Sequence, residues 1–188
     1  MSGDRGAKEL LAEALKDQLQ VMALSKVTVT GLTKQVGLTR QAFYYHFVDV
    51  YDLAVWVFET EVADHIMSHA SYDRWAEGYE QLLTYMREHR TGVYAVIHSL
   101  GHHELERFLY GQFHQMMEAI VAELRGDLTV SAADQERVIS HFALVVLGYC
   151  MYWLASDMAA DPSELVPEIE FLLQGQVRHA LETYAARA

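Results

Sequence analysis

The sequence predicts an all-α protein of about nine helices. Two prolines and 11 glycines among 188 residues are too few for a fold with many turns. The hydrophobic fraction of 52% is enough to bury a sizeable core, which excludes a disordered chain. Apolar residues recur with the spacing of one helix face, and capping residues stand between the apolar stretches.

The N-terminal part is expected to form three helices. Residues 7–24 place mainly apolar side chains at i, i+3, i+4 and i+7. Thr28 can cap a short helix over residues 29–35, which Gly37 then ends. Thr39 can cap a third helix of about two turns. The pattern therefore predicts a compact three-helix unit.

In the rest of the chain, apolar stretches again alternate with capping and helix-breaking residues. Further helices are predicted over residues 49–70, 73–88, 91–100, 103–124, 131–158 and 162–184. Ser131 and Asp134 have the spacing of a capping box, and Asp161 precedes a proline at the first helical position. Pro167 is expected to kink or restart the final helix.

Charge divides the chain into two regions. Residues 1–50 carry six basic and five acidic side chains, whereas residues 51–188 carry eight basic and 21 acidic ones, and all four lysines lie in the first 34 residues. The first region can tolerate a polyanion and the second would repel one. We therefore expect two domains, residues 1–50 and residues 51–188.

Several features indicate a cytoplasmic protein. The single cysteine, Cys150, cannot form an intrachain disulfide, and no Cys/His spacing typical of a zinc site is present. The charged N-terminus does not resemble a secretory signal. The longest apolar run, residues 142–155, is too short to span a bilayer. We expect that run to form a buried helix that also packs against another subunit, with no membrane partner.

Residues 28–47 have the layout of a helix-turn-helix, with a glycine in the turn. Arg40 and Gln41 are side chains that pair bidentately with base edges, and tyrosine hydroxyls can reach phosphates. Phe43 and Phe47 are expected to lie in the core, because a unit of about 50 residues needs aromatic side chains to bury enough surface.

Gly37 and Leu38, followed by the sequence TRQAFYYHF over residues 39–47, resemble the TetR family of transcriptional regulators. The longer stretch RQAFYYHFVDVYDLAVWVFETE is most similar to regulators related to the activator of dihydroxyacetone kinase operons. The resemblance implies a homodimer that binds a palindromic operator through its N-terminal domain and binds a ligand and dimerises through its helical C-terminal domain. Repression is the commoner outcome in the family, and the finer resemblance allows activation.

The resemblance also implies roles for individual residues. Thr28 and Thr30 would contact phosphate or a base edge, Arg40 to Ala42 would face bases, and Tyr44 to His46 would line the groove wall. His46 has an alternative role as a packed or capping histidine. The full set expected to contact double-stranded DNA is Thr28, Thr30, Lys34, Thr39, Arg40, Gln41, Ala42, Tyr44, Tyr45 and His46.

The sequence departs from the family after the recognition helix. Family members usually carry lysines there, where this chain has Val48 and Val50. The resemblance therefore does not imply phosphate contacts at these two positions, and this favours either weaker DNA binding or binding helped by Arg5, Lys8 or Lys26. It also keeps open a second class of function, a helical ligand-binding or partner-binding protein with weakened or lost DNA binding.

Aromatic and thioether side chains in the C-terminal region are candidates for a ligand cavity, although core packing explains most of them equally well. They are Trp75, Tyr79, Tyr94, His98, Phe108, Phe113, Met117, Tyr149 and Trp153. An effector bound by such residues is expected to be largely apolar.

An enzyme, a cofactor and a metal site are not expected. Cys150 lies within an apolar run, and no phosphate-binding glycine loop or Ser/His/Asp signature is present. His98, His102 and Glu106 are spaced i, i+4, i+8, but Gly101 interrupts the helix that would have to align them as metal ligands.

Overall fold

The computed structural model describes residues 2–187 and confirms the all-α fold, because these residues contain helices and connecting turns but no β-strand. Contacts between residues divide the chain into two compact units. The first comprises the residues up to Glu61 together with His89–His102. The second comprises Val62–Glu88 and the residues from His103 onward. The prediction of a functional boundary at residue 50 is separate from this packing division and stays a prediction.

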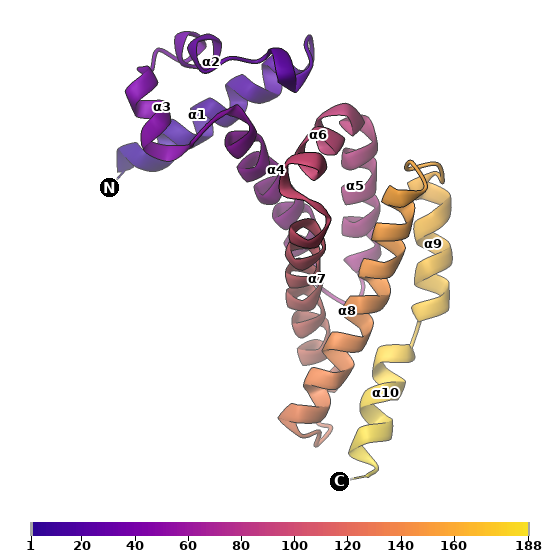
Figure 1. Cartoon of the computed structure of the whole chain (residues 1–188). Coiled ribbons are helices and arrows are strands. Elements are labelled where there is room, and N and C mark those ends of the chain that lie inside the picture. The colour runs from indigo at the N-terminus through magenta and orange to yellow at the C-terminus, as the bar shows by residue number, and fades with distance from the viewer. Residues whose placement is uncertain (1, 188) are drawn as a thin grey trace. The chain divides into compact units, whose positions relative to one another are not determined.

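The first unit contains four complete α-helices, the first part of a fifth and a short 3-10 helix (Figure 1). These are α1 (Ser2–Leu19), the 3-10 helix η1 (Leu24–Lys26), α2 (Val29–Gln35), α3 (Arg40–His46), the first part of α4 (Val50–Met67), and α6 (Arg90–Leu100). Helices α1, α2 and α3 pack on one another. Their shared core contains fully buried side chains, among them Leu11, Leu15, Leu32 and Phe43.

Helix α1 ends at Leu19, five residues before the predicted end. The apolar pattern continues in the sequence, but Val21 is 79% exposed and Met22 is 39% exposed. The chain turns there and continues into η1, which buries Leu24 in the core. Burial of one leucine contributes about 1.5–3 kcal/mol, which offsets the loss of another helical turn.

Helix α6 lies against the end of α1. A Cβ atom built on Gly92 of α6 would be 3.9 Å from Leu19 Cδ1. Val93 and Val96 of the same helix are buried. The first unit is therefore made of two segments that are separated in the sequence by α5 (Trp75–Glu88).

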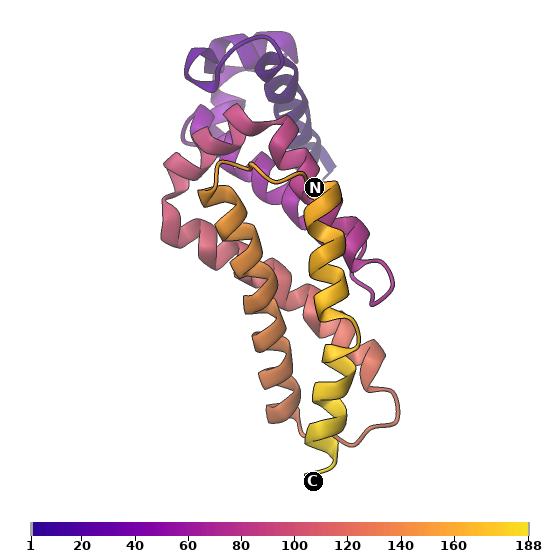
Figure 2. The ribbon, with the colours of Figure 1, turned by 90° about the vertical axis from the view of Figure 1, so that its right-hand side faces the viewer.

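The second unit is a helical bundle. It contains the end of α4, α5, α7 (His102–Arg125), α8 (Ala132–Ala155), α9 (Pro162–Leu173) and α10 (Gln176–Ala185). Helix α9 packs on α5, and α10 packs on α8. Figures 1 and 2 show α9 and α10 running one after the other beside α8.

Tyr79 lies at the centre of the core of the second unit. Its ring packs edge to face on Phe113, with 5.7 Å between the ring centroids. Its hydroxyl donates a hydrogen bond of 3.2 Å to the Val146 carbonyl oxygen on α8. Burial raises the pKa of this phenol well above its usual value. Tyr79 is therefore a neutral core residue.

Three predicted helix boundaries can be compared directly with the structure. Ser131 Oγ accepts the Asp134 N–H at 3.1 Å, and an Asp161 carboxylate oxygen accepts the Ser163 N–H at 3.0 Å, as expected of N-caps. The predicted restart of the helix at Pro167 is wrong, and a kink there stays a prediction. Pro167 lies inside α9, and the helix instead ends before Gly175, whose φ is +73°. Glycine adopts this left-handed conformation without strain, so the final helix divides there into α9 and α10.

Helix α8 is long and apolar enough to resemble a membrane span, with a mean hydropathy of 1.7 over its most apolar window, and half of that window is buried within the protein. A buried core helix has the same composition.

Candidate DNA-binding face and ligand cavity

Helix α3 separates a buried side from an exposed side. Phe43 is 0% exposed and Phe47 is 4% exposed, which confirms both as core residues. Arg40, Gln41 and Tyr45 lie on the exposed side, where Tyr45 reaches 78% exposure. The two phenylalanines thus anchor the helix in the core, and its hydrogen-bonding side chains face solvent.

Arg40 is positioned by its neighbour one turn along the helix. Its guanidinium donates a 3.4 Å hydrogen bond to the Tyr44 hydroxyl and lies 5.8 Å from the centroid of that ring. His46 is half-buried, and the Tyr45 and Phe47 rings lie 4.9 and 6.2 Å from it, centroid to centroid. His46 therefore packs between aromatic rings, which agrees with the alternative role proposed for it.

The remaining candidates in this region surround α3. Thr30 and Lys34 on α2 are exposed. Thr28 and Thr39 are exposed N-caps whose hydroxyl oxygens accept the N–H groups of the residues three positions later, each at 3.1 Å. Each threonine hydroxyl can still donate its proton to an outside acceptor such as phosphate. Ala42 is half-buried.

The two valines after α3 differ in their surroundings. Val48 is 80% exposed, whereas Val50 is 7% exposed and belongs to the core. The carboxylate of Asp52 accepts the Val48 N–H at 2.8 Å, and that of Asp49 accepts the Asp52 N–H at 2.9 Å. Family members usually carry lysines at these two positions, and in this chain only position 48 is exposed to solvent.

The lysines of the first unit are not equally available. Lys16 is engaged with Glu13 at 2.6 Å and Glu61 at 3.1 Å, and its hydrogen bond with Glu13 raises its pKa. In contrast, Lys26 and Lys34 are exposed, and the described residues give them no ion pair. These two lysines and Arg40 are thus exposed cations of the first unit.

Most candidate ligand residues of the second unit fill its core. Tyr79, Phe113, Met117 and Trp153 are at most 4% exposed, and Phe108 and Tyr149 are half-buried. Tyr94 and His98 lie on α6, in the first unit. Of the nine candidates, Trp75 and Met117 line a hollow. A ligand role for all nine stays a prediction.

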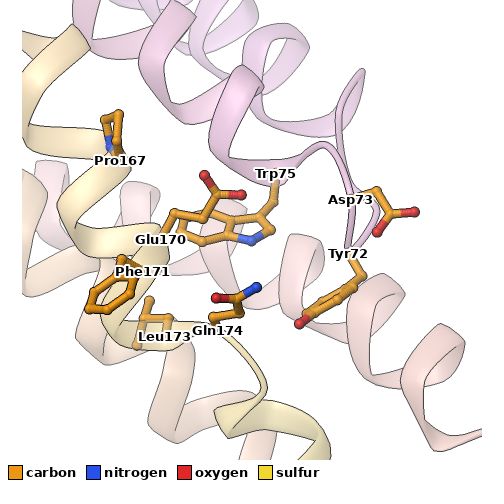
Figure 3. A pocket seen from close by; sticks show the side chains of 8 residues that line it. All are labelled: Tyr72, Asp73, Trp75, Pro167, Glu170, Phe171, Leu173 and Gln174. Carbon is orange, nitrogen blue, oxygen red and sulfur yellow. The ribbon is translucent and has the colours of Figure 1, made fainter.

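A cavity of about 380 Å³ lies between the segment leading into α5 and the helix α9, and Figure 3 shows the residues that line it. The first side provides Tyr72, Asp73 and Trp75, and the α9 side includes Glu170 and Gln174. Sequence reasoning identified only Trp75 among these residues. The others lie close together only because α9 packs on α5, and no local pattern indicates that contact.

An apolar crevice with about 20 Å³ of open space adjoins the cavity. The two hollows share Tyr72, Trp75 and Leu173, and the crevice is otherwise lined by apolar side chains that include Met117 and Phe142. The cavity and the crevice together therefore offer a polar entrance and an apolar interior.

Cys150 is fully buried, and burial raises the pKa of its thiol to about 12. The thiol is therefore un-ionised near neutral pH and does not act as a nucleophile. Within residues 2–187, no three or more His, Cys, Asp or Glu side chains lie close enough to hold a metal ion.

Comparison with known proteins agrees with the geometry of both units. Residues 73–175 match the family model of a TetR transcriptional regulator C-terminal region. The chain belongs to the TetR family. The match covers more than half of the chain, and the helix-turn-helix lies N-terminal to it, as in the layout that the sequence predicts.

Among individual TetR relatives, the HTH-type dhaKLM operon transcriptional activator DhaS of Lactococcus lactis is 25% identical over 114 residues. The aligned region is 61% of this chain, and it spans only 60% of the length of DhaS. This similarity supports the finer resemblance seen in the sequence.

Two solved structures share the fold. A dihydroxyacetone kinase operon activator DhaS is 22% identical, with a TM-score of 0.67 over 92% of this chain and 97% of that one. The TetR family repressor AlkX from Dietzia sp. strain DQ12-45-1b is 18% identical, with a TM-score of 0.55 over 93% of this chain and 96% of that one. The TetR fold thus occurs in proteins named as an activator and as a repressor.

Proposed function

We propose that this TetR protein is a ligand-responsive transcriptional regulator that binds a palindromic operator as a homodimer in the cytoplasm. The observation that carries the proposal is the exposed side of α3, where Arg40, Gln41 and Tyr45 project from a helix anchored by buried phenylalanines. Arginine and glutamine in such a position read base edges in the major groove. Residues 1–50 would bind DNA, and residues 51–188 would bind the ligand and dimerise.

Phosphate contacts would come from the same unit. Thr28 and Thr39 keep a hydroxyl proton to donate, and Lys34 provides an exposed cation at the end of α2. Such contacts fix the position of a protein on DNA and carry no sequence information directly. Base readout would then depend mainly on Arg40 and Gln41.

A dimer is favoured by an exposed apolar stripe on α8. Leu144 is 56% exposed and Tyr152 is 76% exposed, and Gly148 lies between them at the same helical spacing. No atom would lie within 4 Å of a Cβ placed on Gly148, so a partner helix can approach closely there. We propose that α8 and the final segment, in which α9 and α10 run one after the other, form a four-helix bundle with the same two elements of the second subunit.

Sedimentation at micromolar concentration tests the dimer. The wild-type chain should sediment as a dimer, and Tyr152→Arg should shift it to a monomer because the charge would be buried in the interface. Ala122→Arg, on an exposed position of α7, provides a matched control and should leave the dimer intact. A wild-type monomer would contradict this part of the proposal.

The effector is proposed to be largely apolar and to bind in the second unit, where the apolar crevice adjoins the larger cavity. A ligand acts on DNA binding only if it binds one conformation better than another. We propose that it favours a separation of the two recognition helices that no longer matches successive major grooves, about 34 Å apart.

We propose that the protein represses transcription, because repression is the commoner outcome in the family. Expression of a reporter downstream of the operator, with and without the regulator, decides between repression and the activation named for DhaS.

Selection of bound DNA from a random pool tests the regulator as a whole. We expect a palindrome, because a symmetric dimer presents two identical reading helices. A pool without any enriched sequence would instead support the second candidate function, a helical binding protein that has lost DNA binding. The exposed Val48 favours this second function, since a family phosphate contact is missing there.

A further inference from the structure

The entrance of the cavity between α5 and α9 is acidic. Asp73 and Glu170 line it, and none of its lining residues is a lysine, arginine or histidine. Within the part of the chain that the structure describes, neither carboxylate forms an ion pair. An anionic ligand would therefore be repelled, and a cationic ligand would be attracted.

Trp75 supplies a second feature of the cavity. Its side chain is only 7% exposed, and no buried polar side-chain atom in the described residues lacks a hydrogen-bond partner. Among the described residues the indole N–H has no acceptor, so the nitrogen retains access to solvent rather than being sealed in the core. Figure 3 shows the nitrogen on the edge of the ring that faces Tyr72 and Gln174, two residues that line the cavity. The N–H is available to a ligand oxygen.

Aromatic rings complete the entrance. Tyr72 and Trp75 line it from one side and Phe171 from the other (Figure 3). Aromatic faces beside carboxylates are the surroundings in which proteins bind organic ammonium groups. The Tyr72 hydroxyl accepts the Gly175 N–H at 3.2 Å, which ties this wall of the cavity to the turn between α9 and α10.

We propose that the cavity receives an organic amine, with its positively charged end beside the carboxylates and its short apolar part directed towards the adjoining crevice. The carboxylate of Glu170 would attract the ammonium group, and the Trp75 N–H would donate to an oxygen on ligands that carry one. This inference rests on the proposed ligand response and specifies the charge of an otherwise apolar effector.

Calorimetry on the full chain with three probes of equal chain length tests the charge. We expect hexylammonium to bind about threefold to fivefold more tightly than hexan-1-ol, because a partly exposed ion pair contributes at most about that factor. Hexanoate should bind more weakly than the alcohol. Added salt should weaken hexylammonium binding and leave hexan-1-ol binding unchanged.

Two variants locate the charge. Glu170→Gln should bring the affinity for hexylammonium closer to that for hexan-1-ol, with Asp73 left as the remaining carboxylate, while the affinity for the alcohol stays the same. Glu168→Gln is the matched control, because Glu168 is exposed on the same helix and does not line the cavity. Equal losses of affinity for hexylammonium in the two variants would show that the general negative charge of the surface attracts the probe. This result would overturn the proposal of a site at Glu170.

DNA binding is measured separately with and without hexylammonium. Binding of hexylammonium that leaves the DNA affinity unchanged would overturn its role as an effector while keeping the cation site. Equal affinity for all three probes, or no binding of hexylammonium, would overturn the cation site. None of these results would change the outcome of the operator selection, which tests the proposed regulator separately.

Discussion

A lysine at position 48 should add a phosphate contact where Val48 now follows α3. Val48 is 80% exposed directly after α3, so Val48→Lys changes a solvent-facing side chain and should alter the free energy of unfolding by at most about 0.5 kcal/mol. If α3 docks in the major groove, a dimer gains one cation at each half-site.

The expected size follows from counterion release. Each phosphate neutralised steepens the plot of log affinity against log salt by about 0.9, so two contacts add about 1.8. Lowering the salt concentration about fourfold should therefore increase the ratio of variant to wild-type affinity by about twelvefold. The preferred sequence should not change, because phosphate contacts carry position only.

Fluorescence anisotropy across a salt series, on the selected operator and on random DNA, measures this slope. Val21→Lys is the matched control, because Val21 is 79% exposed and lies at the end of α1, so it adds the same charge away from α3. An unchanged slope for Val48→Lys with intact folding, or an equal change in the control, would refute the docking geometry. Lysine at position 50 is not a useful variant, since Val50 is buried and its replacement would unfold the unit.

Three further predictions concern single side chains. Arg40→Ala should weaken specific DNA binding by about 1–3 kcal/mol and relax one base position, whereas Tyr45→Phe should weaken all sequences alike; competition with cognate and random DNA separates the two. The Arg87 guanidinium, 3.0 Å away, holds the pKa of Asp161 at about 2, below its usual 3.8, so the carboxylate stabilises the fold above about pH 4 and loses this effect as the pH falls towards 2. Urea unfolding should accordingly show Asp161→Asn less stable than the wild type near neutral pH, with a difference that shrinks below about pH 4. The Cys150 thiol, with a pKa of about 12, should react with iodoacetamide at neutral pH only when urea unfolds the chain, as mass spectrometry can show.

Local chemistry was enough to predict much of the fold and of the DNA-binding face. Thr28, Thr39 and Ser131 cap helices where their sequence positions indicated, because an N-cap depends only on residues two or three positions away. The exposure of Arg40 follows in the same way, from its position on a short helix whose other side must bury aromatic rings.

Long-range packing could not be predicted in this way. Gly175 could not be ranked above Pro167 as the end of α9, since both residues interrupt helices. The ligand cavity depends on contact between residues about a hundred positions apart, such as Tyr72 and Gly175.

The membership of α6 in the first unit affects how this protein can evolve. The chain passes between the two units three times, after Glu61, after Glu88 and after His102. A recombination event that exchanged only the first 61 residues for those of another regulator would leave α6 behind, to pack against an unfamiliar α1. The surface around Gly92 would then face a foreign side chain in place of Leu19. Exchange of DNA specificity is therefore expected to proceed by substitutions on α3 rather than by replacement of the whole N-terminal segment.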